Sequence, residues 1–498
     1  MNRAKCVKKN KWVLIFCTAV SFFFSCTHTT KTNHLFTLLS PKETGIHFSN
    51  NVSYTEEFNP YTYRNFFNGG GVAIGDVNND GLPDLFFCSN QHSNKLYLNK
   101  GHFQFEDITE KAGVASDGIW STGVTMADVN GDGWLDIYVC KSGDMKGKSR
   151  NNELYINNGP TPLSARRGAG GEAAEVTFTE KAKEYGLDNR GLSTHAVFFD
   201  YDNDGDLDCY LLNNSFRSVG NYDLIKNERK HPDTLGGNKL YRNDLVSPST
   251  GGGRWEAHFT DVTASAGIYS SRIGFGLGVT IADINNDGWQ DIYVSNDFFE
   301  RDYLYINNRD GTFEEAAEKY LRELSMNSMG ADIADINNDG YPEIYVTDMF
   351  PEEESRVKTK TAFENWDKYQ SNITNGYYNQ FVRNTLQLNN GPSPLSSKNN
   401  FFHSPSPNGE GGQRTGEVRG GQAAEVSFSE IGRFSGVCAT DWSWGALIAD
   451  LDNDGFKDIF VANGIAKDIT DQDYIQYSGG AYADLRQQIL NKEKNIIT

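Results

Sequence analysis

The chain contains few cysteines for its length. Only seven occur in 498 residues, and the four beyond Cys26 are Cys88, Cys140, Cys209 and Cys438. This scarcity excludes the disulfide framework that stabilises many small secreted domains. Cys88 and Cys140 lie in hydrophobic, strand-like sequence, and we interpret both as buried thiols that act as small apolar side chains.

Positive charge is also scarce. The chain has 46 Lys and Arg against 66 Asp and Glu, which gives a formal net charge of -20 at pH 7. Nucleic-acid binding depends on contacts between Lys or Arg and phosphates, and a net anionic surface repels phosphates. We therefore expect no nucleic-acid partner, and divalent cations suit this composition better.

The N-terminal hydrophobic run is short. Trp12–Phe24 spans thirteen residues, whereas a membrane-spanning helix needs about 20. Basic residues precede the run, so the pattern is that of an export signal. The following Ser25-Cys26 resembles the lipobox of bacterial lipoproteins, although Phe23 stands where that motif usually has Leu. The resemblance implies that Cys26 is the lipidated first residue of the mature chain; plain cleavage and secretion is the alternative.

What the sequence has in abundance is one acidic repeat. The pattern D-x-[DN]-x-D-G-x-x-[DE] occurs six times, and we number the copies loops 1 to 6 in chain order. The residues of the pattern are Asp76, Asn78, Asp80, Gly81 and Asp84; Asp128, Asn130, Asp132, Gly133 and Asp136; Asp200, Asp202, Asp204, Gly205 and Asp208; Asp283, Asn285, Asp287, Gly288 and Asp291; Asp335, Asn337, Asp339, Gly340 and Glu343; and Asp450, Asp452, Asp454, Gly455 and Asp458.

Strand-like sequence surrounds each loop. A short apolar run precedes it and a β-rich run follows, as in Asp136 to Val139. An N-x-L-Y-x-N run then comes, as at Leu154 to Asn158, and an F-x-D-[IV]-T run, as at Phe105 to Thr109. Four short strands per unit of about 50 residues predict the blades of an all-β propeller. No unit has the sustained 3.6-residue periodicity of a helical solenoid.

The loops have the donor pattern of a calcium site. Oxygen side chains at positions 1, 3 and 5, a Gly at 6 for the turn, a carbonyl at 7 and a carboxylate at 9 can surround one hard cation, and calcium accepts six to eight oxygens. An EF-hand would need Glu at position 12 and a following helix, but every copy has a strand-like apolar residue there. Simple Asx-turns are the alternative. However, the six loops gather twenty acidic side chains, which is costly without counter-ions. We expect up to six calcium ions.

These loops, with the N-x-L-Y-x-N-N-G and F-x-D-[IV]-T runs, resemble FG-GAP (VCBS) repeats. Such repeats form the propellers of integrin alpha subunits and occur in cartilage acidic protein and its bacterial relatives. The resemblance covers roughly residues 36–475. It implies a propeller fold and calcium binding at the loop positions given above. It is less specific for function, because family members serve adhesion, glycan handling or unknown roles.

The sixth unit departs from this pattern. Its loop and second strand, Ile459 to Ala462, are present, but no N-x-L-Y run or seventh loop follows. We expect about six blades in a closed ring, or an open ring that is truncated relative to a seven-bladed relative. Phe36 to Ile46 resembles an isolated fourth strand, and it is a candidate to complete the last blade.

One face of the predicted propeller is the candidate ligand face. Inserts rich in Ser, Pro and Gly fall on the loop side, whereas more complex inserts and several aromatic residues fall on the opposite side. Trp120, Phe275 and Trp442 share one register and suit packing between blades as well as ligand contact. Trp444 lies outside that register and is the better surface candidate. Two further candidates are unusual inner-strand residues, His195 and Asp332.

The sequence favours a binding module over an enzyme. We expect residues 1–25 to be a signal peptide, 26–35 a tether, 36–475 the propeller and 476–498 a tail. The first hypothesis is a lipid-anchored protein of the cell envelope, facing the periplasm or the surface, that binds a glycan or an extracellular protein. The second is a carbohydrate-active enzyme, similar to propeller polysaccharide lyases, with His195 as base. A third is a fragment whose missing part carries the function.

Overall fold

The computed structural model describes residues 35–60, 62–116, 120–143, 150–159, 175–217, 224–245, 257–360, 366–392, 426–464 and 471–472. The chain divides into two units, residues 1–40 and 41–498. In the first unit only residues 35–40 are described, and they form no helix or strand. The expected signal peptide, Cys26 and most of the C-terminal tail lie outside the described residues. No helix within the described ranges has the length and apolarity to cross a membrane.

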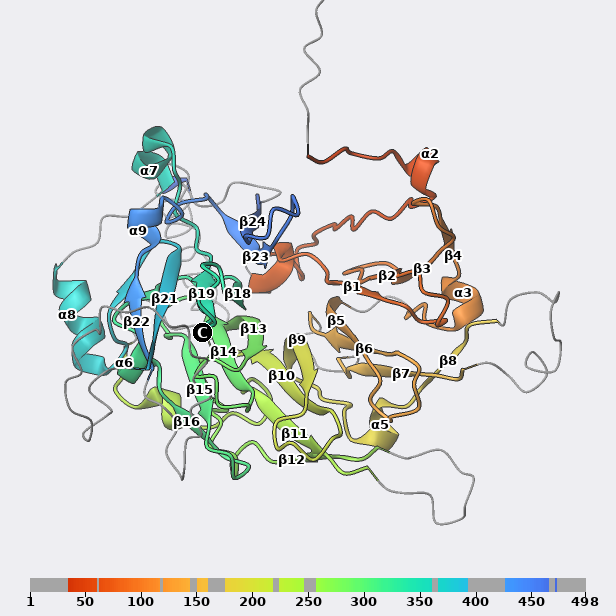
Figure 1. The fold of residues 1–498 in the computed structure, drawn as a ribbon, viewed down its shortest axis with the longest axis horizontal. Helices are drawn as coiled ribbons and strands as arrows, with labels where there is room; N and C mark the ends of the chain where they lie inside the picture. The colour runs from red at the N-terminus through yellow and green to blue at the C-terminus, as the bar shows by residue number, and fades with distance from the viewer. Residues whose placement is uncertain are drawn as a thin grey trace, which may run out of the picture. The chain divides into compact units, whose positions relative to one another are not determined.

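The second unit is built from antiparallel sheets whose strands follow chain order (Figure 1). Five sheets have four strands each, and we name them blades 1 to 5. They are β1 (Val72–Gly75), β2 (Asp84–Phe87), β3 (Lys95–Asn99) and β4 (Phe105–Asp107); β5 (Ser121–Ala127), β6 (Asp136–Lys141), β7 (Glu153–Asn157) and β8 (Phe178–Glu180); β9 (Leu192–Phe199), β10 (Asp208–Asn214), β11 (Lys239–Asn243) and β12 (Phe259–Asp261); β13 (Gly276–Ala282), β14 (Asp291–Asn296), β15 (Tyr303–Asn307) and β16 (Phe313–Glu315); and β18 (Ala331–Ala334), β19 (Glu343–Val346), β21 (Thr385–Pro392) and β22 (Val426–Glu430).

Blade 6 has two described strands, β23 (Ser443–Ala449) and β24 (Asp458–Asn463). The first strands of the six blades, β1, β5, β9, β13, β18 and β23, pack side by side in chain order. This radial succession of sheets is a β-propeller, as the sequence predicted, and each acidic loop joins the first two strands of its blade.

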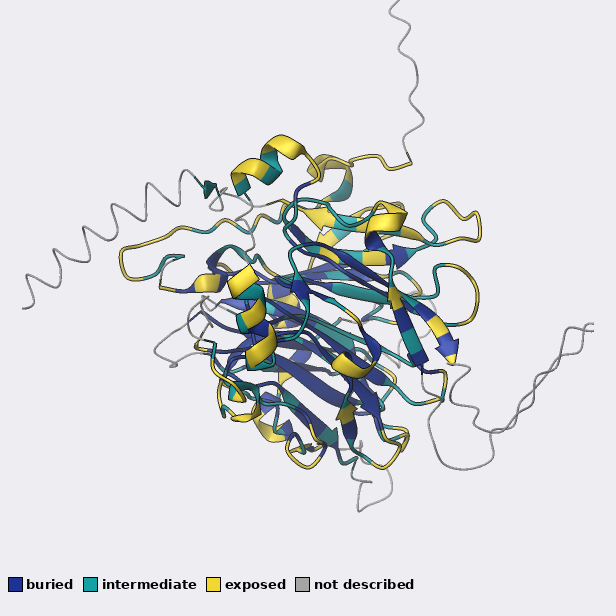
Figure 2. Cartoon of the chain, turned by 90° about the vertical axis from the view of Figure 1, so that its left-hand side faces the viewer, coloured by how far each residue is buried: buried dark blue, intermediate teal, exposed yellow. Residues whose placement is uncertain are grey.

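The hydrophobic core lies between successive blades. Phe86 and Leu96 of blade 1, for example, pack with Ile137 and Val139 of blade 2. A sheet with a neighbouring sheet on each side is therefore buried on both faces. Every residue of β6 and β14, for example, is buried. Figure 2 shows this pattern, with buried strands inside and exposed residues concentrated in the connections. Cys88, Cys140 and Cys209 are buried in these cores and unbridged, which agrees with their interpretation as small apolar side chains.

An asparagine of the third strand joins each of blades 2 to 5 to the blade before it. Its Nδ2 donates a hydrogen bond to the carbonyl of loop position 2 in the preceding blade. The four pairs are Asn157 to Val77 at 2.9 Å, Asn243 to Val129 at 3.1 Å, Asn307 to Tyr201 at 2.7 Å and Asn389 to Ile284 at 2.9 Å. The Asn of the N-x-L-Y-x-N run therefore contributes to packing between sheets as well as within one.

Short helices, which the sequence pattern does not predict, follow the fourth strands of blades 1, 2, 4 and 5. They are α3 (Thr109–Ala112), α5 (Ala182–Tyr185), α6 (Ala317–Tyr320) and α9 (Gly432–Ser435). Three of them end at a glycine with left-handed φ, as at Gly113 with φ 75°. One turn of helix is too short to produce a visible 3.6-residue period, which explains the omission.

The expected extra strand at Phe36 to Ile46 is wrong for its second half. Pro41–Thr44 form a helix, α2, and Gly45 ends it with φ 76°. Proline suits the first turn of a helix and glycine its end, which accounts for this outcome. A Cβ built on Gly45 would lie 2.5 Å from the carbonyl oxygen of Phe105, so the turn packs against blade 1.

The connections opposite the acidic loops contain most of the remaining structure. They include α7 (Glu354–Lys360), α8 (Trp366–Asn375), the 3-10 helices η1 (Arg64–Phe67) and η2 (Glu228–Lys230), and a parallel pair of β17 (Leu324–Ser325) with β20 (Gln380–Phe381). The inserts rich in Ser, Pro and Gly fall almost entirely outside the described residues.

Candidate functional site

The six acidic loops share one backbone shape. Position 4 is Asn in five loops and Gly131 in loop 2, and all six residues have φ between 55° and 69°. The glycine at position 6 also has positive φ, for example 85° at Gly81. In loop 1, both oxygens of Asp76 accept backbone N–H bonds, from Asp80 at 3.1 Å and Gly81 at 2.7 Å. The loop therefore folds around its own first carboxylate.

The acidic residue at position 9 joins the loop to the third strand of its blade. In blade 2, Asp136 accepts N–H bonds from Val129 at 3.1 Å and from Asn157 at 2.8 Å. Asp84, Asp208 and Asp291 make the equivalent pairs of bonds. These carboxylates are buried, so position 9 organises the blade in addition to being a candidate cation ligand.

Burial and neighbouring carboxylates disfavour the ionised form of these position-9 groups. Burial raises the pKa of Asp84 to about 6, of Asp136 and Asp291 to about 7, and of Asp208 to about 8. Other aspartates of each loop raise these pKa values further, and the backbone hydrogen bonds only partly offset them. A cation in the loop would favour the ionised form of these carboxylates and would offset the repulsion among the loop aspartates.

Loop 3 provides a direct test of whether the donors fit a cation. One carboxylate oxygen from each of Asp200, Asp202 and Asp204 lies within 4.8 Å of the other two, and Asp450, Asp452 and Asp454 of loop 6 form a second such group. Oxygens about 2.4 Å from a shared calcium ion can be at most about 4.8 Å apart. Asp202 Oδ1 is also buried without a hydrogen-bond partner among the described residues. The donors therefore fit calcium.

A cavity of about 430 Å³ lies at the opposite ends of the inner strands. Phe275 and Leu277 near the start of β13, Trp442 and Trp444 near the start of β23, and Phe298 just after β14 contribute to its walls. Because each acidic loop follows the end of a first strand, this cavity is on the face that the sequence predicted for ligands.

The cavity combines aromatic walls with one cation and one buried carboxylic acid. Arg64 of η1 lies over the Phe298 ring, with its guanidinium carbon 4.9 Å from the ring centre. Burial raises the pKa of Asp297 to about 7, and the charge of Arg64 partly offsets this effect. Phe298 has φ 65°, a strained conformation for a bulky residue, and such strain is frequent at ligand sites.

The predicted surface residue Trp444 lines this cavity. Its Nε1 donates a 2.7 Å hydrogen bond to the carbonyl of Gly464, and its ring centre lies 6.0 Å from that of Trp442. Trp120, Phe275 and Trp442 share one sequence register but lie in two different environments. Trp120 is buried against Tyr63 and Phe66, whereas Phe275 and Trp442 line the cavity.

His195 and Asp332 do not line the cavity. His195 lies on β9 of blade 3, and burial lowers its pKa, so its imidazole is neutral at pH 7. Asp332 lies on β18 of blade 5 and accepts a 2.6 Å hydrogen bond from the N–H of Ile448 in blade 6. Strand β13 of blade 4 packs between these two strands, so the structure does not bring the two residues together.

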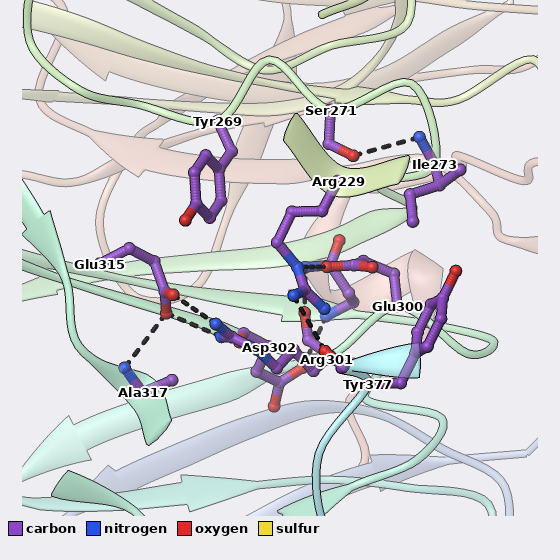
Figure 3. A network of polar contacts seen from close by, with 12 residues as sticks. Arg229, Tyr269, Ser271, Ile273, Glu300, Arg301, Asp302, Glu315, Ala317 and Tyr377 are labelled. Carbon is purple, nitrogen blue, oxygen red and sulfur yellow. Dashed lines mark hydrogen bonds and ion pairs between the residues drawn. The ribbon is translucent and has the colours of Figure 1, made fainter. Parts of the chain in front are cut away.

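A buried ionic network holds the connections around blade 4. Arg229 bonds to Glu300 and donates a 3.0 Å hydrogen bond to the carbonyl of Gly376, while Arg301 forms a two-pronged pair with Glu315 (Figure 3). These residues come from the insert after β10, the segment after α8, the β14–β15 connection and β16. The network fixes the inserts on the cavity side of the molecule.

Sequence reasoning missed Arg64, Asp297 and Phe298. Asp297 and Phe298 lie in the connection after β14, which has no counterpart in the repeated motifs. The repeat pattern therefore could not point to them. Arg64 lies in the segment before blade 1, which is rich in aromatic residues between Tyr54 and Phe67. That aromatic enrichment was the available signal for a packed segment.

Comparisons with known proteins agree with the repeat structure. A family model described as FG-GAP-like repeat matches residues 57–139 and 283–346. Cartilage acidic protein 1 of Xenopus tropicalis is 26% identical over 254 residues, which cover 50% of this chain and 31% of that protein. Integrin alpha-6 of Gallus gallus is 39% identical over 83 residues, 14% of this chain and 8% of that protein. Integrin alpha-3 of Mus musculus is 36% identical over 83 residues, again 14% and 8%.

The radial sheets and the six acidic loops define the molecule as a repeat β-propeller. The FG-GAP-like repeats and the similarity in sequence to cartilage acidic protein 1 and to integrin alpha chains support an FG-GAP repeat β-propeller. The match spans less than a third of the length of cartilage acidic protein 1.

Proposed function

We propose that this chain is an exported, calcium-stabilised β-propeller that acts as a binding or adhesion module for a glycan or an extracellular protein. The observation that carries the proposal is the cavity opposite the acidic loops, where Phe275, Phe298, Trp442 and Trp444 surround a polar pair, Arg64 and Asp297. Ligand sites commonly combine apolar and aromatic walls with a few placed polar groups. The similarity to integrin alpha chains also supports a binding role.

Calcium would be held by positions 1, 3, 5 and 9 of the loops. A bound ion would supply positive charge where loop carboxylates converge and would fix the turn between the first two strands of each blade. Its role in this proposal is structural, and the ligand cavity is at the other ends of the inner strands. Calcium removal should therefore weaken ligand binding indirectly, through the stability of the blades.

Lipidation at Cys26 would tether the propeller to the cell envelope, with secretion as the alternative. The apolar run before Cys26 and the lipobox resemblance support this part of the proposal. In a bacterial host that processes lipoproteins, the full-length chain should fractionate with membranes. A Cys26→Ser chain should appear in the soluble or secreted fraction, and unchanged membrane association would contradict the tether.

Binding is favoured over catalysis. The enzyme hypothesis required His195 as a base on the ligand face, but His195 and Asp332 lie in different blades and outside the cavity. We therefore propose a ligand that is held without chemical change.

An array of glycans and extracellular matrix or envelope proteins, probed with the full-length chain, tests the binding role. A ligand held in the cavity should lose at least tenfold in affinity with Trp444→Ala, because a stacked aromatic side chain contributes about 1 to 3 kcal/mol in such contacts. Trp366→Ala is the matched control, since Trp366 is exposed on α8 and does not line the cavity. Equal binding by wild type and Trp444→Ala would contradict the site, and depolymerisation of a bound glycan would contradict a purely binding role.

A further inference from the structure

Loop 4 contains an arginine at the oxygen that a cation would need. In every loop, Oδ1 of the position-5 aspartate accepts the N–H of position 7, as Asp287 accepts that of Trp289 at 2.9 Å. This bond leaves Oδ2 as the main candidate to hold an ion. In loop 4, Oδ2 of Asp287 accepts two hydrogen bonds from Arg309, from Nη2 at 2.8 Å and from Nε at 3.1 Å. The guanidinium therefore occupies the oxygen that calcium would use.

The turn after β15 holds Arg309 in an unusual backbone conformation. Arg309 stands two residues after Asn307 and donates its N–H to Oδ1 of that residue at 2.8 Å. Its φ is 65°, which is unfavourable for a side chain of this size. Glycines with φ between 60° and 81° occupy the same place in blades 1, 2 and 5, namely Gly101, Gly159 and Gly391. Blade 4 thus keeps the left-handed turn but has an arginine where the repeat has glycine.

The contact is specific to loop 4 in comparison with most other loops. The position-5 aspartates of loops 1, 3, 5 and 6 form no ion pair with a described residue; they are Asp80, Asp204, Asp339 and Asp454. The side chain of Asp287 is only 4% exposed and that of Arg309 is 37% exposed. Because the carboxylate is buried, salt screens this pair less than it screens a pair on the open surface.

The arginine also lowers the negative charge that loop 4 offers to an ion. The affinity of a calcium loop depends on how many charged ligands it supplies and on how rigidly they are held. Loops 1 and 4 each have three acidic side chains in the pattern. At loop 4 the single positive charge of Arg309 offsets one of them. An entering calcium ion would either displace the guanidinium or be repelled by it, and both outcomes weaken binding.

Arg309 has space to leave the loop when an ion enters. It borders a cavity of about 500 Å³, together with Asp202 and Asp204 of loop 3 and Trp289 of loop 4. Its side chain is already partly exposed. The ion pair can therefore open by rotation of one side chain, and the sheet of blade 4 does not need to unfold.

We infer that Arg309 is a built-in competitor for calcium at loop 4, so that this loop fills only at a higher calcium concentration than loop 1. The inference rests on calcium binding by the loops, as proposed above. Loop 1 is the matched reference, because both loops have Asp, Asn, Asp and Asp at positions 1, 3, 5 and 9. Below the filling concentration, the guanidinium provides the counter-ion that clamps the turn of blade 4.

Hydrogen exchange of the full-length protein during a calcium titration measures the loops separately. In wild type, the amides of residues 284–289 should become protected with a midpoint about tenfold or more above that of residues 77–82 in loop 1. Arg309→Gly should lower the loop 4 midpoint by about tenfold and leave loop 1 unchanged, because glycine suits the left-handed turn and has no charge. Lys100→Gln is the matched control. It removes one positive charge from the corresponding turn of blade 1, where Lys100 pairs with Glu106 at 3.1 Å, and it should leave both midpoints unchanged.

A second variant separates the charge of Arg309 from its backbone strain. Asparagine also tolerates left-handed φ and has no charge, so Arg309→Asn should lower the loop 4 midpoint as Arg309→Gly does. Equal midpoints for loops 1 and 4 in wild type, or a shift with glycine alone, would overturn the inference and leave calcium binding intact. Absence of protection at every loop in millimolar calcium would overturn calcium binding itself, and the inference with it.

Discussion

At the scale of single residues, aspartates of this protein have two distinct physical roles. Position-9 groups such as Asp136 accept backbone hydrogen bonds and hold a blade together. The aspartates at positions 1, 3 and 5 instead converge on one point, most clearly in loop 3, where Asp202 Oδ1 is buried without a partner among the described residues. A bound cation would account for the second arrangement, and position 9 makes its backbone hydrogen bonds in addition to being a candidate ligand of that cation.

Asp202→Asn therefore should remove one calcium equivalent without disrupting the blade. Asparagine keeps one oxygen donor but loses the negative charge. The calcium affinity of loop 3 should therefore fall more than that of any other loop. Isothermal titration calorimetry should count one tight site fewer than in wild type. At a calcium concentration of about 100 times the dissociation constant, each occupied site adds about 2.7 kcal/mol to the free energy of unfolding. Asp367→Asn, on the exposed face of α8, is the charge-matched control, and an equal calcium count in Asp202→Asn and this control would refute the assignment.

Asp302 should make stability depend on pH. Burial raises its pKa to about 7, although it accepts hydrogen bonds from Tyr293 at 2.7 Å, Ser328 at 2.8 Å and the N–H of Asn296 at 2.8 Å. Because its folded pKa lies above the unfolded value of about 4, folding favours the protonated acid. That contribution is complete below about pH 4 and is lost as pH rises through about 7.

The free energy of unfolding should therefore fall in wild type by up to about 1.4 kcal/mol per pH unit between pH 4 and 7 through this group. Asp302→Asn should remove that slope, since asparagine does not titrate. Urea unfolding in excess calcium at several pH values measures the difference between the two proteins. Parallel pH profiles would show that Asp302 does not carry the effect.

The sequence predicted some site residues and not others for identifiable reasons. Trp444 was found because it departs from the register of the repeat. His195 and Asp332 also depart from it, but they lie on inner strands outside the cavity, because a periodic pattern shows only that a position is unusual. Arg64 and Asp297 belong to connections without repeats, where the contact of residues distant in sequence decides their roles.

At the scale of elements, local patterns predicted the strands and loops well. The loop pattern and the N-x-L-Y-x-N run each recur with their own turn residues. The residues of each motif therefore determine its local backbone structure. Helices α7 and α8 were not predicted, because no residue of α7 and only Asn372 of α8 is buried, so neither helix buries an apolar face. The extra strand expected at Phe36 to Ile46 failed where Pro41 and Gly45 favoured a helical turn.

The bond between blades can be isolated by comparing two asparagines. Asn157 Nδ2 donates to Leu135 within its own blade and to Val77 in the blade before. Among the described residues, Asn99 Nδ2 donates only to Pro83 in its own blade. Both side chains also accept an N–H bond from a nearby glycine. Asn157→Ala leaves the buried Val77 carbonyl unpaired, and Asn99→Ala leaves no such group.

Chemical unfolding should show that Asn157→Ala costs about 1 to 3 kcal/mol more than Asn99→Ala, the usual penalty for a buried unpaired polar group. Both variants should keep the β-sheet spectrum of wild type. If both variants lose the same stability, the hydrogen bond from Asn157 to Val77 adds nothing to the free energy of unfolding beyond the bonds within a blade.

At the scale of the whole molecule, charge and architecture are linked. The formal charge of -20 is concentrated partly in the six loops, and six divalent ions would offset 12 of those negative charges. The blades pack through apolar sheet faces, while the loops bring like charges together at the end of each inner strand. Calcium in the loops would thus remove the main electrostatic repulsion in an otherwise conventionally packed propeller.

Thermal unfolding of the full-length protein in chelator and in millimolar calcium tests this central claim most directly. The melting temperature should rise by several degrees with calcium and clearly less with equimolar magnesium, because magnesium demands a tighter octahedral site. Identical melting curves in chelator and in calcium would contradict the claim that these loops bind calcium and stabilise the blades.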